Sequence, residues 1–136
     1  MTENHAPLTV PINDEASLSV VRRAVDEAGQ SLGFGLVDQT KLMTAASELA
    51  RNILLYARDG RVTIDHANAA GRRGLRLTFE DGGPGIANLE RAMQDGYSTG
   101  QGMGLGLPGA KRLAHEFSID SEPGVGTRVV YVLWRR

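Results

Sequence analysis

Two glycine-rich stretches carry residues whose types and spacing could bind a nucleotide. Residues 80–86 read Glu-Asp-Gly-Gly-Pro-Gly-Ile, and residues 100–107 alternate glycine with other residues. Glycine is used where the backbone takes a positive φ or approaches a ligand closely. The second stretch opens an expected helix at 107–117, whose free N–H groups and positive dipole end would form an anion site. We therefore predict a triphosphate held by backbone groups, since no Walker motif with its Gly-Lys-Ser/Thr ending is present.

A helix is expected beside these stretches. It is predicted to begin at Asp38 or Thr40, and its segment 44–56 faces the glycine-rich stretches. Glu48 and Asn52 lie four residues apart, so they are neighbours on one flank and one ligand could contact both side chains. The buried stripe that orients the helix is predicted to contain Leu42, Ala45, Ala46, Leu49, Ile53 and Tyr56.

The side chains at these positions suit phosphoryl chemistry on a nucleotide. The Glu48 carboxylate could accept the proton of an attacking hydroxyl group that lies within hydrogen-bond reach. The carbonyl oxygen of Asn52 is a hard neutral ligand of the kind that Mg²⁺ accepts beside water and phosphate oxygens. Asp81 follows an alternating strand, and its carboxylate could accept a hydrogen bond from the exocyclic amine of a base.

Each feature taken alone also has a structural explanation. Glu48 and Asn52 would form a solvated polar flank of a helix, and Asp81 would cap a turn, because Asp-Gly is a standard turn signal. The alternating glycines of the second stretch would form a flexible loop, although glycine at a helix start costs about 1 kcal/mol relative to alanine. The nucleotide hypothesis therefore depends on the three features occurring together.

Composition restricts the classes of function. The 136 residues are expected to form a single domain, 1–136, with a flexible N-terminus over residues 1–7. A net charge of −1 provides no strong field, so neither nucleic acid nor a membrane is expected as a partner. The absence of cysteine excludes disulfides, thiol catalysis and cysteine-based metal sites. With no apolar run of about 20 residues and no signal peptide, a cytoplasmic location is expected.

The remaining pattern predicts an α+β fold. The predicted helices occur in pairs, and these pairs are separated by pairs of consecutive strands. This order indicates a mixed, mostly antiparallel sheet with helices covering one face. The polar, glycine-rich segment 96–102 is a candidate lid. The other predicted elements are an edge strand at Leu8–Ile12, a helix capped by Asn13 or Asp14 that runs to about Leu32, a strand hairpin of 61–66 and 75–79, a short helix at 88–95, a helix at 107–117, and strands at 118–121 and 127–134.

Three motifs in this order resemble the N, G1 and G2 boxes of the GHKL ATPases, the superfamily of gyrase B, Hsp90, histidine kinases and MutL. They are Glu48-x-x-x-Asn52, Asp81-Gly82-Gly83-Pro84-Gly85 and Gly102-Met103-Gly104-Leu105-Gly106. The surrounding sequence is similar to that of the RsbT-type switch-protein kinases, and this resemblance extends from about Asp14 to Trp134. It is carried by residues 47–52, 95–99, 106–113 and 124–127.

The resemblance implies the Bergerat fold, an α/β sandwich that binds ATP and Mg²⁺ between the helices and the glycine loops. By resemblance, Glu48 is the base that acts on the substrate hydroxyl, and Asn52 is the Mg²⁺ ligand. Asp81 would hold the adenine amino group, with Thr127 supporting it through water. The resemblance also assigns to the ATP site Gly83 and Gly85, which would shape its adenine side, Gly102, Gly104 and Gly106 on its phosphate side, and Ile86, Met103 and Leu105.

The RsbT-type proteins are serine/threonine kinases of bacterial partner-switching modules, so the resemblance implies that function. Their substrates are STAS-domain antagonists and scaffolds, in some bacteria within the stressosome, and they can activate a PP2C-type phosphatase.

Histidine kinases and topoisomerases are disfavoured by the short segment between the boxes and by the lack of a phosphoacceptor-histidine helix pair or a second domain. Two alternatives stay open: an RsbW-type anti-sigma factor kinase that also sequesters a sigma factor, and a non-catalytic nucleotide-dependent binding module. The STAS substrate and the oligomeric state are also left open.

Overall fold

The computed structural model describes residues 6–86, 93 and 106–135. In chain order the elements of this part are β1 (Leu8–Ile12), α1 (Glu15–Leu32), α2 (Leu36–Tyr56), β2 (Gly60–Ala69), β3 (Arg72–Asp81), α4 (Gly106–Arg112), β4 (Glu116–Glu122) and β5 (Gly126–Trp134). The predicted lid at 96–102, and the predicted helix at 88–95 apart from residue 93, lie outside the described residues. Within the described ranges, no helix is long and apolar enough to cross a membrane.

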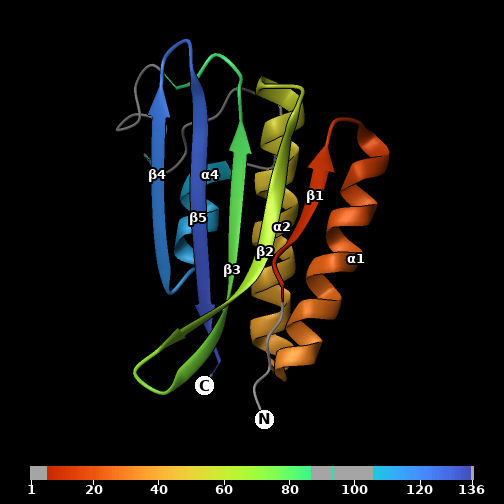
Figure 1. The fold of residues 1–136 in the computed structure, drawn as a ribbon, viewed down its shortest axis with the longest axis vertical. Coiled ribbons are helices and arrows are strands. Elements are labelled where there is room, and N and C mark those ends of the chain that lie inside the picture. Colours follow the sequence, from red (N-terminus) through yellow and green to blue (C-terminus); the bar gives the residue numbers. More distant parts are fainter. Residues whose placement is uncertain (1–5, 87–92, 94–105, 136) are drawn as a thin grey trace.

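The strands form one sheet in the order β1-β2-β3-β5-β4, and every pairing between these described strands is antiparallel. Helices α1, α2 and α4 lie on one face of this sheet (Figure 1). The predicted α+β class is therefore confirmed, and the described sheet is antiparallel throughout where a mixed sheet was predicted. Two of these pairings are local, because β2–β3 and β4–β5 are hairpins, which pair antiparallel. β1 lies at the edge, where a strand containing Pro11 is tolerated.

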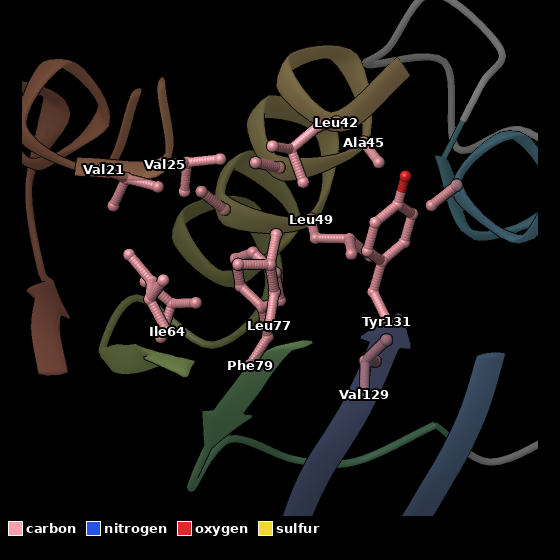
Figure 2. Packing of buried hydrophobic residues seen from close by; sticks show 14 of the residues in the cluster. Val21, Val25, Leu42, Ala45, Leu49, Ile64, Leu77, Phe79, Val129 and Tyr131 are labelled. Atoms are coloured by element: carbon pink, nitrogen blue, oxygen red, sulfur yellow. The ribbon is translucent and has the colours of Figure 1, made fainter. Parts of the chain in front are cut away.

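Alternating strand residues face the helices and form the core. Val62 and Ile64 of β2 and Leu77 of β3 are at most 4% exposed, and they belong to one cluster with the helices. Burying one such apolar side chain stabilises the fold by about 1.5–3 kcal/mol, so this layer holds α2 against the sheet. Figure 2 shows the packing of this cluster, with labelled residues from α1 (Val21, Val25), α2 (Leu42, Ala45, Leu49), β2 (Ile64), β3 (Leu77, Phe79) and β5 (Val129, Tyr131).

The opposite face of the sheet carries charges that pair across neighbouring strands. Arg76 of β3 donates two hydrogen bonds to the Asp65 carboxylate of β2, at 3.1 and 2.9 Å. Glu80 of β3 lies between Arg61 of β2, at 3.3 Å, and Arg128 of β5, at 3.6 Å. Pairs of this kind at a solvated surface contribute about 0–1 kcal/mol each. The stability of the fold therefore comes mainly from the face that the helices cover.

Helix α1 begins and ends where the sequence predicts. Asp14 is its N-cap, and the Asp14 Oδ1 atom accepts a hydrogen bond from the Ser17 N–H at 2.9 Å. This bond satisfies one of the free N–H groups of the first turn. Gly33 ends the helix in the left-handed region, with a φ of 85°, which a residue with a side chain rarely adopts.

Helix α2 begins at Leu36 with Gly35 as its N-cap, so the predicted start at Asp38 or Thr40 was wrong. The Thr40 hydroxyl donates to the Leu36 carbonyl oxygen at 2.9 Å, which is a bond inside the helix rather than a cap. Asp38 lies in the first turn, where its negative charge interacts favourably with the positive end of the helix dipole. The polar residues that suggested a helix start therefore belong to the first turn.

Helix α4 ends at Arg112, so the predicted extension to Phe117 was wrong. The N–H of His115 already donates to the Val132 carbonyl oxygen at 2.9 Å, and Phe117 pairs with Tyr131 in the β4–β5 hairpin. Phe117 packs on the core from this strand. An apolar residue at this position fits a helical pattern and a strand pattern equally, so its spacing did not separate the two.

Tyr131 connects α4 to the sheet. Its side chain is fully buried, and its hydroxyl donates to the carbonyl oxygen of Leu113, just beyond the end of α4, at 2.8 Å. Burial raises the pKa of the Tyr131 hydroxyl well above its ordinary value of 10.0, and the negative charge of Asp38 raises it further. The Tyr131 hydroxyl therefore ionises at a lower pH in the unfolded chain than in the folded protein.

We expect Tyr131 to cause a loss of stability as the pH rises above about 10, where an unfolded tyrosine ionises. Because the folded pKa is the higher one, this contribution is complete below about pH 10 and declines above it. Urea unfolding of the wild type and of Tyr131→Phe between about pH 8 and pH 11 measures the effect. At the lower pH, Tyr131→Phe should be about 1–3 kcal/mol less stable, because the Leu113 carbonyl loses its donor.

The matched control is Tyr56→Phe, because Tyr56 is 46% exposed at the end of α2. It should follow the alkaline decline of the wild type, whereas Tyr131→Phe should decline less. An alkaline decline in Tyr131→Phe as steep as that of the wild type would contradict the assignment.

Candidate functional site

Helix α2 carries Glu48 and Asn52 on a flank beside its buried stripe. Of the six predicted stripe residues, five are at most 4% exposed, which confirms the orientation of the helix. Tyr56 was predicted to be buried and is 46% exposed, because it is the last residue of the helix. The Glu48 side chain is 13% exposed, and its Oε2 atom lies 3.3 Å from the Arg51 guanidinium. Asn52 is half-buried.

Asp81 is the last residue of β3 and faces the helices. It is paired with Gly60 of β2 and with Thr127 of β5, and it follows the buried Phe79 on the same face. Its Oδ1 atom accepts a hydrogen bond from the Gly83 N–H at 3.0 Å. The turn-capping role that the sequence allowed is therefore present, and that bond uses only one of the two carboxylate oxygens.

Gly83 lets the first glycine loop, which comprises residues 82–86, pack directly on the end of α2. A Cβ atom at Gly83 would lie 2.6 Å from the Cβ of Ala57 and 2.9 Å from its Cα. Ala57 is the C-cap residue of α2. A side chain has no space there, so this contact requires glycine. The contact brings the first glycine loop against the helix that carries Glu48 and Asn52.

The first glycine loop also contacts the turn between β4 and β5. Gly85 has a φ of 77°, and a Cβ atom there would overlap the carbonyl group of Glu122. The N–H of Gly124 donates to the carbonyl oxygen of Pro84 at 2.8 Å. Gly126 has a φ of 146°, and a Cβ atom there would overlap the last carbonyl group of β3. The backbone of the first glycine loop therefore packs directly against the backbone of the β4–β5 turn.

Ser121 of β4 joins these parts, although no motif in the sequence marked it. Its Oγ atom accepts a hydrogen bond from the Ile86 N–H at 2.7 Å. The same atom lies 2.8 Å from the Oγ1 of Thr127 and 3.2 Å from the carbonyl oxygen of Gly126. Ser121 follows Ile119 on the helix-facing side of β4. Two signals in the sequence could have identified Ser121. Strand alternation places it on the helix-facing side of β4, and it lies close in sequence to Thr127.

A hollow of about 620 Å³ opens at this end of the sheet. The residues that line it include Asp81, Ser121 and Thr127 on the helix-facing side and Arg61, Glu80 and Arg128 on the opposite side. Of these six residues, only Asp81 and Thr127 belong to the predicted site. The hollow therefore marks the exposed sheet end beside that site and does not outline the predicted nucleotide.

The second glycine stretch is described only at its last glycine. Gly106 has a φ of 46° and begins α4, which packs beside α2 and contributes Ala110 to the core. The other residues predicted there, Gly102, Met103, Gly104 and Leu105, lie outside the described residues. In the part of the chain that the structure describes, no group of three His, Cys, Asp or Glu side chains is arranged to hold a metal ion.

Comparison with known protein families identifies the family of the chain. Residues 37–136 match the profile of the histidine kinase-, DNA gyrase B-, and HSP90-like ATPases. The chain belongs to this ATPase family. Its predicted resemblance to the GHKL ATPases is thereby confirmed, and the matched segment contains all three predicted boxes.

Individual members of the ATPase family give a closer comparison. The chain is 45% identical over 127 residues to the serine/threonine-protein kinase RsbT of Bacillus subtilis (strain 168), covering 93% of this chain and 96% of the relative. It is 32% identical over 125 residues to an anti-sigma F factor of Clostridium kluyveri, covering 88% and 87%. These relatives confirm the predicted resemblance to the RsbT-type kinases and the predicted enzyme class, a serine/threonine-protein kinase.

A solved structure supports the fold of the ATPase family. The mycobacterial sensor histidine kinase MprB superposes with a TM-score of 0.57 at 19% identity, covering 98% of this chain and 99% of that one. At this level of identity the likeness concerns the fold alone. It agrees with the predicted arrangement of helices on one face of a sheet.

We expect Gly83→Ala to destabilise this ATPase by about 1–3 kcal/mol, because the new methyl group must displace Ala57 at the end of α2. Gly82→Ala is the matched control. Its Cβ atom would meet nothing within 4 Å, so its effect should stay within about 0.5 kcal/mol. Urea unfolding of both variants measures the difference. Equal stability of the two variants would contradict the close contact between the first glycine loop and α2.

Proposed function

We propose that this ATPase is an ATP-dependent serine/threonine protein kinase of a bacterial partner-switching module, with STAS-domain antagonists or scaffolds as substrates. The observation that carries the proposal is the contact between Gly83 and Ala57, which joins the Asp81 loop to the helix bearing Glu48 and Asn52. The 45% identity to the RsbT kinase supports the choice of reaction. Activation of a PP2C-type phosphatase, docking on a stressosome and a cytoplasmic location are further parts of the proposal.

The described residues fit ATP with Mg²⁺. Asp81 keeps one carboxylate oxygen outside its bond to Gly83, and this oxygen would accept from the adenine amino group. Thr127, paired with Asp81 across β3 and β5, would support that contact through water. Gly85 and Ile86 would shape the same side of the site, since both are held to the β4–β5 hairpin.

Asn52 would provide the protein ligand to Mg²⁺. An amide oxygen is a suitable donor because Mg²⁺ takes oxygen ligands and keeps several waters and phosphate oxygens around it. Bound in this way, the ion would neutralise negative charge on the phosphates. Gly106, which begins α4 beside α2, would approach the phosphate side together with Gly102 and Gly104. Met103 and Leu105 would belong to the same ATP site.

Glu48 would act as the base for the substrate hydroxyl. Its side chain is mostly buried, and Arg51 engages its Oε2 atom at 3.3 Å, so the carboxylate has a defined orientation. The substrate oxygen would attack the γ-phosphorus, the bond to the bridging oxygen of ADP would break, and Glu48 would take the hydroxyl proton. This requires the substrate serine or threonine to reach the flank of α2.

A second candidate is a kinase that also sequesters a sigma factor. It is favoured by the 32% identity to the anti-sigma F factor over 88% of the chain. Co-purification with sigma factors separates this candidate from the first one. A partner-switching kinase of the first type should retain STAS proteins and should not retain a sigma factor. A non-catalytic nucleotide-dependent binding module is the third candidate. The presence of Glu48 disfavours it, because binding alone does not need a base.

We expect Asp81→Asn to weaken ATP binding at least about tenfold, which corresponds to about 1.4 kcal/mol. The amide can still accept from the Gly83 N–H, but its NH₂ group would face the amino group of adenine, donor against donor. Isothermal titration calorimetry with ATP and Mg²⁺ measures the affinity. Asp120→Asn is the control, because Asp120 is exposed on β4. Unchanged affinity in a folded Asp81→Asn variant would remove Asp81 from the site.

Variants of α2 should separate binding from transfer. Glu48→Gln keeps its shape but cannot take a proton, so ATP affinity should stay near wild type while phosphoryl transfer falls by roughly 10²–10⁴-fold. The loss will be smaller if positioning and electrostatics dominate the reaction. Asn52→Ala should impair both ATP binding in Mg²⁺ and transfer. Single-turnover phosphorylation of a STAS protein, with ATP titration of each variant, gives both quantities.

The control for these variants is Glu27→Gln, since Glu27 is exposed on α1. It should match the wild type in binding and in transfer. Transfer at the wild-type rate in Glu48→Gln would reject the base assignment and would favour the binding-module alternative. Sigma capture by the wild-type chain would favour the second candidate.

A further inference from the structure

Arg51 forms an ion pair with Glu48, the residue proposed as the base. The Nη1 atom of Arg51 donates to the Oε2 atom of Glu48 at 3.3 Å, one turn apart on α2. The Arg51 side chain is 36% exposed, whereas the Glu48 side chain is 13% exposed. One oxygen of the mostly buried carboxylate is therefore engaged by a cation that lies on the solvent side of the helix.

Arg51 and Asn52 lie on opposite sides of Glu48 around the helix. Successive residues of an α-helix are turned by about 100°. Asn52 is therefore turned about 40° from Glu48 in one direction, and Arg51 is turned about 60° in the other. Leu49 and Ile53 are at most 4% exposed, and they show that Asn52 lies toward the buried stripe and Arg51 away from it. The ion pair therefore holds the carboxylate away from the flank that Asn52 shares with the proposed phosphates.

A base beside ATP can act on water as well as on a protein hydroxyl group. In this side reaction a water oxygen would attack the γ-phosphorus, the bond to the bridging oxygen of ADP would break, and Glu48 would take a proton from the water. ATP would then be hydrolysed to ADP and phosphate without any protein substrate. Enzymes limit such side reactions by completing the reactive arrangement only when the correct substrate is bound.

Arg51 lies on the side of α2 from which a protein substrate would approach. Among the described elements, the sheet covers the buried stripe of α2 (Figure 1). Helix α1 covers the side that carries Ser47, whose Oγ atom accepts a hydrogen bond from the Nε atom of Arg22 at 3.1 Å. The Asn52 side belongs to the proposed nucleotide site. A substrate hydroxyl that reaches Glu48 therefore approaches over the side where Arg51 lies.

We propose that Arg51 is a positioning residue that restrains Glu48 until a protein substrate docks on α2. In the free protein the ion pair keeps the carboxylate from acting on water. A docked substrate displaces the Arg51 side chain, and Glu48 is then free to take the proton of the substrate hydroxyl. The inference rests on the proposed function, because it takes Glu48 as the base.

The test compares ATP hydrolysis without substrate with phosphorylation of a STAS protein. A partly exposed ion pair shifts an equilibrium by about two- to fivefold, which limits the expected effect. Arg51→Gln should therefore raise hydrolysis about two- to fivefold, measured as phosphate release at saturating ATP and Mg²⁺. Phosphorylation of the STAS protein should stay near the wild-type rate, because the docked substrate releases Glu48 in either case.

Two controls separate this restraint from a general effect of charge or of helix stability. Arg23→Gln should change neither reaction, because Arg23 is exposed on α1. Arg51→Lys keeps the positive charge and should keep hydrolysis close to the wild-type rate. Salt screens exposed ion pairs, so hydrolysis by the wild type should rise with ionic strength relative to hydrolysis by Arg51→Gln. A stabilising role in the helix would produce no such convergence of the two rates.

A double-mutant comparison shows whether Arg51 acts through Glu48. In a Glu48→Gln background, Arg51→Gln should leave hydrolysis unchanged, because no base remains to be released. A rise of the full size in that background would overturn the proposal, since Arg51 would then act on water or ATP directly. Unchanged hydrolysis in Arg51→Gln alone would overturn it too. So would a fall in hydrolysis and transfer together, because Arg51 would then assist the base.

Folding of the variant and the proposed function are checked separately. Where Arg51→Gln does not fold, Arg51→Met keeps an unbranched side chain without the charge, and it should raise hydrolysis in the same direction. Wild-type protein that phosphorylates a STAS protein, while the uncharged Arg51 variants hydrolyse ATP at the wild-type rate, would refute the role of Arg51 and leave the proposed function intact. Absence of both reactions in the wild type and in the variants would refute both.

Discussion

The close contact between the first glycine loop and the end of α2 organises this end of the molecule. Because Gly83 has no side chain, the loop after β3 can lie on Ala57, and the helix cannot move away without breaking the contact. Gly60 acts in the same way at the start of β2, where a Cβ atom would lie 2.9 Å from the Ile53 side chain of α2 and 2.5 Å from the Glu80 carbonyl oxygen. One glycine at the start of β2 and one in the loop after β3 therefore set the distance between α2 and the sheet end that carries Asp81.

Much of this arrangement could be predicted from the sequence because it follows from simple periodicity. The buried stripe of α2 repeats at helical spacing, which fixes the flank on which Glu48 and Asn52 lie. Strand alternation ending in Phe79 places Asp81 on the same, helix-facing side of β3. The prediction for the end of α4 failed because one residue satisfied two patterns. Phe117 fits the end of a helix and the start of a strand, and its backbone hydrogen bonds to β5 decide between them.

The bond between Ser121 and the first glycine loop could not be predicted from the sequence, although strand alternation and the nearby Thr127 could have placed Ser121 at this end of the sheet. Its partner Ile86 lies 35 residues away, and the two meet only after the β4–β5 hairpin has packed against the first glycine loop. Serine is common at the surface, so its type carries no signal. Gly85 is recognisable as a loop glycine, but its need for a positive φ becomes clear only when the Glu122 carbonyl is seen behind it.

Stability and chemistry are separated on α2 but combined at the sheet end. Glu48 and Asn52 lie beside the buried stripe, so the core residues that hold the helix do not depend on them. Either side chain can therefore change while the fold remains, which lets one scaffold serve catalysis or binding alone. At the sheet end, by contrast, Gly83 and Ser121 each hold the backbone in place and shape the proposed adenine site. Substitutions there should alter folding and binding together, so an effect on binding is informative only in a variant whose fold is intact.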